Sequence, residues 1–202
     1  MYIKPFLYLS ILFKIVSAKT IIIGDSMFAE SPVKQHLENW CNCNIDNYAK
    51  VGASLEEGWI ESIPCQYNDI KELCPTTIIM DGGGNDVMSH INECRQLTEQ
   101  CKILIDNVII NIANSLITEM NNNNVHNIVY LGFYYLQNLN EVIDYGSEKI
   151  LSICNNTNNC YFSDPRNISM PLGWDGVHPT SEGFELLAHN IWNTIQDNNI
   201  IL

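Results

Sequence analysis

The sequence Thr20-Ile21-Ile22-Ile23-Gly24-Asp25-Ser26-Met27 decides the fold of this chain. A β-branched apolar run stops at a Gly-Asp-Ser turn and continues into a segment with a helical pattern. A short apolar run bounded by a glycine turn predicts a buried parallel strand. Ser26 would then follow the carboxyl end of the first strand, where open α/β sheets place their chemistry. A serine at this position is a candidate nucleophile.

The Gly-Asp-Ser turn alone could be a simple helix cap. Three further sequence blocks favour a functional role for it. Gly52 follows a second expected strand, Gly83-Gly84-Asn85-Asp86 follows a third, and Asp175-Gly176-Val177-His178-Pro179 lies near the C-terminus. In this order and spacing, the four blocks resemble those of the SGNH (GDSL-type) hydrolase family. The resemblance covers nearly the whole chain beyond residue 19.

Strand and helix patterns alternate along the chain, which predicts a parallel sheet covered on both faces. The expected strands are residues 20–23, 45–51, 76–80, 125–133 and 161–162, and the expected helices are 27–40, parts of 55–73 with a break at Pro64, 97–120, 141–153 and 181–196. The apolar stripe of the helix at 97–120 is assigned to the core rather than to a cofactor site. This order suits a flavodoxin-like three-layer α/β/α sandwich, and the resemblance implies a five-stranded parallel sheet in the order 2-1-3-4-5.

Ester cleavage by a serine needs a nucleophile, a base, a group that orients the base, and donors for the oxyanion. Ser26 would be the nucleophile, His178 the base and Asp175 its orienting partner. The backbone NH groups of Ser26 and Gly52 and the side-chain amide of Asn85 would form the oxyanion hole. Glycine suits position 52 because a Cβ would crowd the approach to that NH. The family assigns these roles to its Ser, Gly, Asn and His blocks.

A phosphate-binding loop is the alternative for the glycines at 82–84. No Gly-Lys-Ser/Thr follows them, and Asp81 and Asp86 flank them with the wrong charge. Asp86 is expected to fix the loop by hydrogen bonds. The chain departs from the commonest form of the family at Met27, where leucine often follows the serine, and in its extra glycine, Gly82. The histidines without a partner pattern are expected to be structural: His36, His90, His126 and His189.

Residues 1–18 have the pattern of a secretory signal peptide. Lys4 precedes a mostly apolar run at 6–16, and Val16-Ser17-Ala18 supplies small residues for cleavage near Ala18. An uncleaved anchor is the alternative, but Lys14 interrupts the run, which is shorter than the ~20 residues of a spanning helix. We predict no other spanning segment, no stable membrane insertion after cleavage, and a hydrolase domain at 19–202.

The charge of the chain limits its partners. Removing Lys4 and Lys14 reduces the 10 basic side chains to 8 against 23 acidic ones, so the net charge falls from −13 to −15. Such a field repels nucleic acid and anionic membrane surfaces. The expected partner is a small-molecule or glycan ester, while the oligomeric state stays open.

Eight cysteines behind a signal peptide indicate disulfides formed in an oxidising compartment. The chain has no Cys-x-x-Cys pair and no second half at zinc-ligand spacing, so we expect neither a metal nor an organic cofactor. Two glycosylation sequons fit secretion: Asn155-Asn156-Thr157 and Asn167-Ile168-Ser169.

The cysteine spacing also suggests how the pairs form. Two pairs are expected to close locally: Cys94 with Cys101 and Cys154 with Cys160. A helix between Cys65 and Cys74 would put their Cα atoms ~13 Å apart, beyond the ~7 Å limit for a disulfide. We therefore expect Cys41 and Cys43 to pair with Cys65 and Cys74, in one order or the other.

These patterns predict a secreted serine esterase that hydrolyses small or medium acyl esters through an acyl-enzyme. O-acetyl groups on carbohydrate are the first expectation, because so short a chain has little room for a lid or a deep acyl pocket. Lipid or lysophospholipid esters come second. The alternatives are an acyltransferase that uses the same serine and a non-catalytic carbohydrate-binding relic, which the four intact blocks disfavour.

Overall fold

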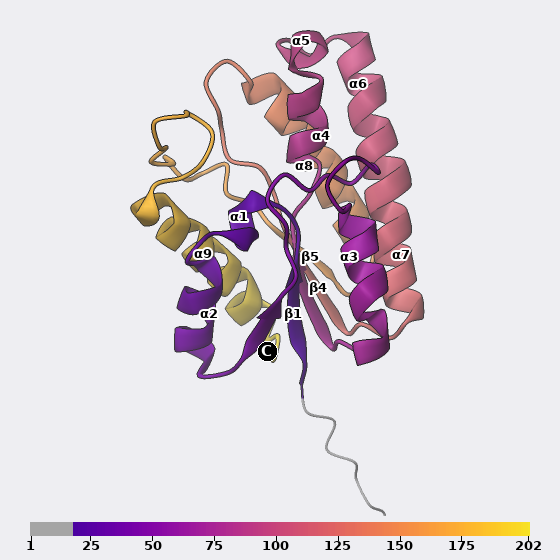
Figure 1. The fold of residues 1–202 in the computed structure, drawn as a ribbon, viewed down its shortest axis with the longest axis vertical. Helices are drawn as coiled ribbons and strands as arrows, with labels where there is room; N and C mark the ends of the chain where they lie inside the picture. The colour runs from indigo at the N-terminus through magenta and orange to yellow at the C-terminus, as the bar shows by residue number, and fades with distance from the viewer. Residues whose placement is uncertain (1–17) are drawn as a thin grey trace, which may run out of the picture.

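The computed structural model describes residues 18–202, which form a parallel sheet between two layers of helices (Figure 1). The strands are β1 (Thr20–Ile23), β2 (Ile45–Asn47), β3 (Thr77–Met80), β4 (Asn127–Leu131) and β5 (Cys160–Ser163). They pair in parallel in the order β2-β1-β3-β4-β5, which confirms the predicted fold class and strand order. The predicted signal peptide lies outside the described residues, apart from Ala18.

The helices cover both faces of the sheet (Figure 1). One face is covered by α2 (Val33–Cys41) and α9 (Ser181–Asp197), and the other by α3 (Ile63–Ile70), α8 (Asn140–Asn155) and a long helix made of α6 (Glu99–Asp106), η2 (Asn107–Ala113) and α7 (Asn114–Asn122). The shorter helices are α1 (Ser26–Ala29), η1 (Lys71–Leu73), α4 (Gly84–Ser89) and α5 (Ile91–Cys94).

The three isoleucines of β1 explain why this segment is a central strand. Successive side chains of a strand point to opposite faces. Ile21 and Ile23 pack in one core cluster, Ile22 packs in the other, and all three are fully buried. Burying each such side chain stabilises the fold by about 1.5–3 kcal/mol. A strand buried on both faces must be apolar at every position, as this run is.

Several predicted elements have different bounds in the structure. The helix predicted at 27–40 is divided into α1 and α2, and the strand predicted at 125–133 is limited to Asn127–Leu131. The second strand ends at Asn47 rather than at residue 51, because the Asn47 side chain accepts a hydrogen bond from the Ala49 NH at 3.0 Å and donates one to the Phe28 carbonyl at 2.9 Å. Pro64 does not break a helix but lies in the first turn of α3, where its missing NH costs nothing.

The long helix extends from Glu99 to Asn122, with a π-helical stretch at η2 in its middle. By length and composition it could cross a membrane, contrary to our expectation for segments beyond residue 18. Its stripe is nevertheless part of the core, since Val108 and Met120 are fully buried and Leu116 is nearly so.

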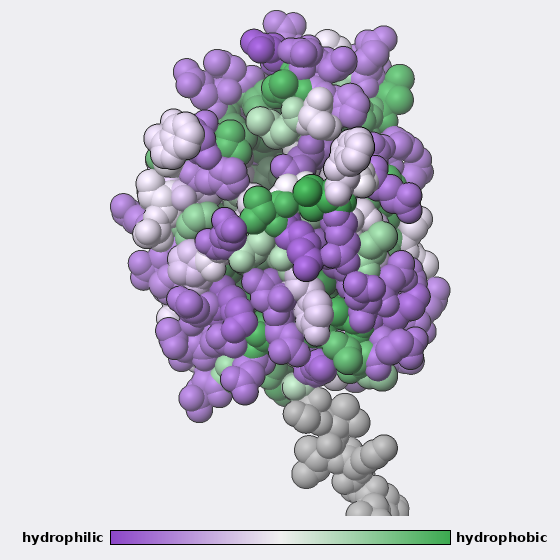
Figure 2. All heavy atoms as spheres, viewed as in Figure 1, coloured by the Kyte–Doolittle hydropathy of each residue, from purple (hydrophilic) through white to green (hydrophobic). Residues whose placement is uncertain are grey.

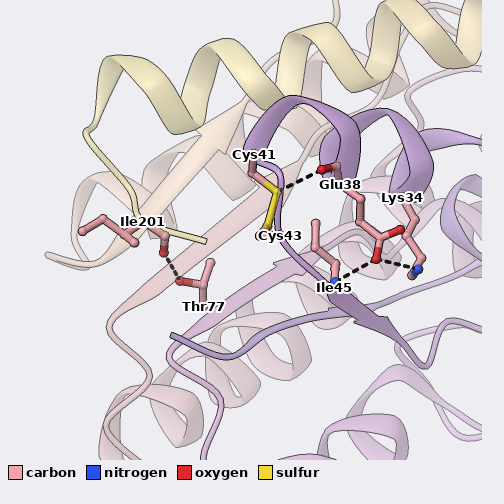
Figure 3. Close-up of a disulfide and its surroundings, with 7 residues drawn as sticks. All are labelled: Lys34, Glu38, Cys41, Cys43, Ile45, Thr77 and Ile201. Atoms are coloured by element: carbon pink, nitrogen blue, oxygen red, sulfur yellow. Dashed lines mark hydrogen bonds and ion pairs between the residues drawn. A yellow bond between two sulfur atoms is a disulfide. The ribbon is translucent and has the colours of Figure 1, made fainter. Parts of the chain in front are cut away.

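Three disulfides are present among the described residues. The bridges Cys94–Cys101 and Cys154–Cys160 agree with the prediction. The third bridge joins Cys41 to Cys43, so the predicted pairing with Cys65 and Cys74 is wrong (Figure 3). The reason is local, because Asn42 between the two cysteines is left-handed, with φ of 53°. This turn at the end of α2 brings the Cα atoms of Cys41 and Cys43 to 5.2 Å.

Glu38 fixes the connection between α2 and β2 beside this disulfide (Figure 3). Its carboxylate accepts hydrogen bonds from the Lys34 ammonium at 2.8 Å and from the Ile45 NH at 2.9 Å. These contacts lower the pKa of Glu38, the Lys34 hydrogen bond most of all. The edge strand is therefore held at its first residue by the helix that precedes it.

We predict that peptide mapping without reductant will find the three local bridges and two free thiols, Cys65 and Cys74. Cys74 is exposed and should react with a thiol reagent in the folded protein, whereas Cys65 is only partly accessible. Denaturation without reductant should raise the number of thiols that react with the reagent to two per chain. A peptide that joins Cys65 or Cys74 to Cys41 or Cys43 would contradict the structure.

Candidate active site

The four sequence blocks meet at the carboxyl edge of the sheet. Ser26 is the first residue of α1, directly after β1, and Asn85 lies in α4, directly after β3. Gly52 lies in the loop after β2, and the loop after β5 carries Asp175 and His178. Because the strands are parallel, all of these segments leave the sheet at the same edge.

Ser26, His178 and Asp175 form one chain of hydrogen bonds. The Ser26 Oγ lies 2.9 Å from Nε2 of His178, and Nδ1 of that ring lies 2.6 Å from Oδ2 of Asp175. The other carboxylate oxygen of Asp175 accepts the backbone NH groups of Val177 and His178, each at 3.0 Å. The His178 ring, followed by these two amides, lowers the pKa of Asp175 to about 2. An ionised Asp175 requires the proton on Nδ1, which leaves Nε2 free to accept from the serine.

The loop that carries the histidine is fixed at its base. Residues Leu172 and Pro179 form an antiparallel bridge, and the Gly173 NH donates to the His178 carbonyl at 2.7 Å. The Tyr134 hydroxyl donates to the Val177 carbonyl at 2.6 Å. The segment after β4 therefore helps to hold the His178 backbone at the height of Ser26.

The three candidate oxyanion donors belong to segments that touch one another. Asn85 Nδ2 donates to the Ala53 carbonyl at 2.7 Å and more weakly to Asp25 Oδ2 at 3.3 Å. Gly52 precedes Ala53 and has φ of +78°, a left-handed conformation that favours glycine. This backbone requirement is a reason for glycine that the sequence did not reveal. The requirement comes from the backbone conformation and not from crowding, because the nearest atom to an added Cβ would be Ile60 Cγ1, at an ordinary contact distance of 3.7 Å.

Asp86 has the structural role that its position predicted. Its two carboxylate oxygens accept the backbone NH groups of Leu55 and Glu56, both at 2.9 Å. The side chain is nearly fully buried, and burial raises its pKa. Asp86 thus fixes the loop after β2 to α4, next to Asn85.

The carboxyl group of Asp81 is buried next to Asp25, and the sequence analysis did not predict this pair. Asp25 and Asp81 are 6% and 5% exposed, and the Asp25 NH donates to Oδ1 of Asp81 at 2.8 Å. Within residues 18–202, Oδ2 of Asp81 has no hydrogen-bond partner. Burial raises the pKa of both carboxyls, and the charge of Asp25 raises that of Asp81 further. The available signal was an acidic residue directly after the buried strand that ends at Met80.

The Gln66 side chain holds the end of β1, a role that the sequence analysis did not predict. Its side-chain oxygen accepts the Gly24 NH at 2.8 Å, and its NH₂ group donates to the Gly24 carbonyl at 3.0 Å. A Cβ at Gly24 would lie 1.9 Å from Oδ1 of Asp81, so only glycine fits beside this carboxyl group. A buried polar residue on the apolar face of α3 was the signal for this contact.

A cavity of about 360 Å³ opens beside Ser26, Asn85 and His178. Figure 2 shows a hollow in the upper half of the molecule, with hydrophobic residues inside it and hydrophilic residues around it. The lining away from the serine is mainly apolar and includes Val87, Ile105, Ile109, Phe133, Val142 and Ile143. We expected a chain of this length to have little room for a deep pocket, and the cavity is larger than that expectation.

Three of the other histidines have side-chain contacts away from the chain of hydrogen bonds through His178. The rings of His36 and His189 lie against Trp40, and His90 contacts the carbonyl of Asp86. No group of three His, Cys, Asp or Glu side chains that could hold a metal ion occurs in the part of the chain that the structure describes.

A hydrogen-bonded serine, histidine and aspartate at the carboxyl edge of a parallel sheet is the arrangement of a serine hydrolase. The family model described as GDSL-like Lipase/Acylhydrolase matches residues 23–191. The chain therefore belongs to this family of SGNH (GDSL-type) hydrolases, and it is a serine ester hydrolase.

Solved structures show the same fold at low sequence identity. The chain is similar to TesA, with a TM-score of 0.66, 15% identity, and coverage of 89% of this chain and 98% of that one. It is also similar to a carbohydrate esterase of family 3 from Talaromyces cellulolyticus, with a TM-score of 0.66, 15% identity, and coverage of 90% and 97%. An acetyl esterase mutant with acetate ion has a TM-score of 0.68, 15% identity, and coverage of 90% and 97%. No curated protein sequence matches the chain.

We predict that Asp81→Asn will weaken the dependence of stability on pH. The folded-state pKa of Asp81 is raised above the ~3.9 of an unfolded chain, so its contribution is full below about pH 4 and is lost as pH rises toward the folded value. Thermal unfolding between about pH 4 and pH 8 should therefore show a smaller fall in Tm for Asp81→Asn than for the wild type. Asp69→Asn, at an exposed position on α3, is the control. Equal falls in Tm for both variants would contradict the assignment.

Proposed function

We propose that the protein is a secreted esterase that cleaves small or medium acyl esters through an acyl-enzyme on Ser26. The hydrogen-bonded chain from Ser26 through His178 to Asp175 is the observation that supports this proposal most strongly. Membership of the GDSL-like lipase and acylhydrolase family supports the reaction class.

Acylation would begin when Ser26 Oγ attacks the ester carbonyl carbon. His178 Nε2 takes the serine proton, and the resulting imidazolium is stabilised by ionised Asp175. The tetrahedral intermediate collapses, the bond between the carbonyl carbon and the alcohol oxygen breaks, and His178 gives its proton to the leaving alcohol. The acyl group then remains on Ser26.

Deacylation would repeat these steps with water. His178 takes a proton from water, the hydroxide attacks the acyl carbonyl, and the proton returns to Ser26 Oγ as the carboxylic acid leaves. An acyltransferase would differ only in using an acceptor alcohol in place of water. The oxyanion of both intermediates would accept hydrogen bonds from the NH groups of Ser26 and Gly52 and from the Asn85 amide, which would give up its long 3.3 Å bond to Asp25 Oδ2 to make this contact.

The alcohol part of the ester would lie on the open side of the site. Two tryptophans in loops at this edge are fully exposed, Trp174 next to Asp175 and Trp59 in the loop that follows Gly52. The face of an exposed indole ring is a flat apolar surface, which suits contact with a sugar ring. This favours a carbohydrate alcohol, with a lipid ester as the second possibility.

Secretion is supported by the cysteine chemistry. The bridges Cys41–Cys43, Cys94–Cys101 and Cys154–Cys160 use six of the eight cysteines, and such bridges persist in oxidising compartments. The signal-peptide pattern at residues 1–18 gives the route. Expression with and without this segment, followed by assay of the medium and N-terminal sequencing, would test the assignment.

We predict that Ser26→Ala and His178→Ala each reduce kcat by on the order of 10⁴ or more and that the double variant is hardly worse, because the two residues act as one unit. Ester hydrolysis by the purified variants measures this. Ser115→Ala and His126→Ala, at exposed positions away from the site, are matched controls and should keep wild-type rates. More than a tenth of the activity left in Ser26→Ala would rule out the assignment.

Asn85→Ala should reduce kcat by roughly 10²- to 10³-fold with little change in KM, because its amide acts only when charge develops on the carbonyl oxygen. Steady-state kinetics with a soluble ester separates the two constants. Asn111→Ala, on the exposed side of η2, is the control. A change in KM alone would show that Asn85 binds substrate instead.

A further inference from the structure

We propose that the cavity beside Ser26 is an acyl-binding pocket that selects a straight acyl chain of medium length over acetate. This inference rests on the proposed esterase function and concerns the acyl side of the same site. Its first support is continuity, because one cavity contains Ser26, Asn85 and His178 as well as the apolar residues behind them. A chain attached to the carbonyl at Ser26 would extend into that apolar region.

The lining fits the chemistry of an alkyl chain. Behind the serine, the walls come from α6, η2, α8 and the segment after β4, including Ile105, Ile109, Val142 and Phe133. Among the described residues, the carboxylates that line the cavity are Asp25, Asp81 and Asp175, and all three belong to the serine end described above. A ligand that carried a charge at its far end would lose hydration there without gaining a partner, whereas a methyl terminus would lose nothing.

The volume sets the length of the chain. A cavity of about 150 Å³ holds benzene, so a cavity of about 360 Å³ has room for roughly a dozen carbon atoms. Part of this space lies at the mouth and is needed for the carbonyl and the attacking oxygen. A chain of about six to ten carbons fills the remainder, whereas an acetyl group would leave most of it empty.

Two glycines keep this space open. Gly146 lies inside α8, where glycine is disfavoured relative to alanine, and a Cβ there would lie 3.2 Å from the Phe133 ring. A Cβ at Gly83 would lie 2.9 Å from Ile109 Cδ1. Ile109 belongs to the π-helical stretch η2, and such stretches are frequent at functional sites. Each side chain added at these points would intrude into the wall of the cavity.

The test is the dependence of kcat/KM on acyl length, measured with straight-chain p-nitrophenyl esters from acetate to palmitate. Each buried methylene should increase kcat/KM by roughly fourfold until the pocket is full. Octanoate has six methylenes more than acetate, so we expect the wild-type value to rise by roughly 10³- to 10⁴-fold from acetate to octanoate and to fall again before palmitate.

A pair of neighbouring substitutions shows whether this cavity is responsible. Ile109 is 2% exposed and lines the cavity, whereas Ile110 is 41% exposed and lies outside it. Ile109→Phe should shorten the preferred chain and lower the ratio of octanoate to acetate by about tenfold or more. Ile110→Phe, the same change one residue on, should keep the wild-type ratio. Gly146→Ala, which suits a helix better than glycine, is a second filling variant and should lower the ratio less.

The outcomes separate this inference from the proposed function. Hydrolysis that depends on Ser26 but declines steadily from acetate onward would overturn the pocket and leave the esterase proposal standing. A medium-chain optimum that Ile109→Phe and Gly146→Ala leave unchanged in folded protein would place the chain elsewhere and overturn the inference as well. Absence of Ser26-dependent hydrolysis for every ester would overturn both proposals.

Discussion

The site depends on the hydrogen bonds that hold Gly24 and Asp25 at the end of β1. The Gln66 amide binds both the NH and the carbonyl of Gly24, and the Asp81 carboxyl accepts the Asp25 NH. The Asp25 side chain then caps α1 by accepting the Met27 NH at 2.9 Å. These contacts are buried, so losing one partner would leave a polar group without compensation, at a cost of about 1–3 kcal/mol. They fix the backbone on either side of Ser26.

The other functional groups need little further precision from the fold. Asp175 and His178 are three residues apart in one loop, and the same carboxylate both orients the ring and accepts the two backbone amides of its own turn. The orientation of the His178 ring is therefore set by contacts within its own loop, and the rest of the fold has only to place this loop over Ser26. The Tyr134 hydroxyl does so by binding the Val177 carbonyl.

The sequence predicted the fold, and it indicated the candidate residues that the structure brings together, because those features leave local traces. A run such as the three isoleucines after Thr20 suits only a strand buried on both faces, and the Asp175 to His178 spacing suits a self-contained loop. The sheet order and the oxyanion roles came from the family resemblance rather than from the residues. Asp81 was missed because an acid next to three glycines has the pattern of an exposed turn, whereas the structure buries it.

Features that depend on packing could not be predicted in this way. The cavity is lined by Gly83 and Gly146, and a Cβ at these positions would lie 2.9 Å from Ile109 Cδ1 and 3.2 Å from the Phe133 ring. Nothing in the sequence shows that these positions face one another. The Cys41–Cys43 bridge likewise depends on one left-handed residue, Asn42, whose conformation no periodicity reveals.

The most direct test of the account is covalent labelling with a small fluorophosphonate, which reacts only with an activated serine. We expect one adduct per chain, which peptide mapping will locate on Ser26. The adduct should be absent from Ser26→Ala and form far more slowly in His178→Ala, because the histidine accepts the serine proton. A wild-type protein that hydrolyses esters but stays unlabelled at Ser26, or carries the label on another residue, would contradict the central claim.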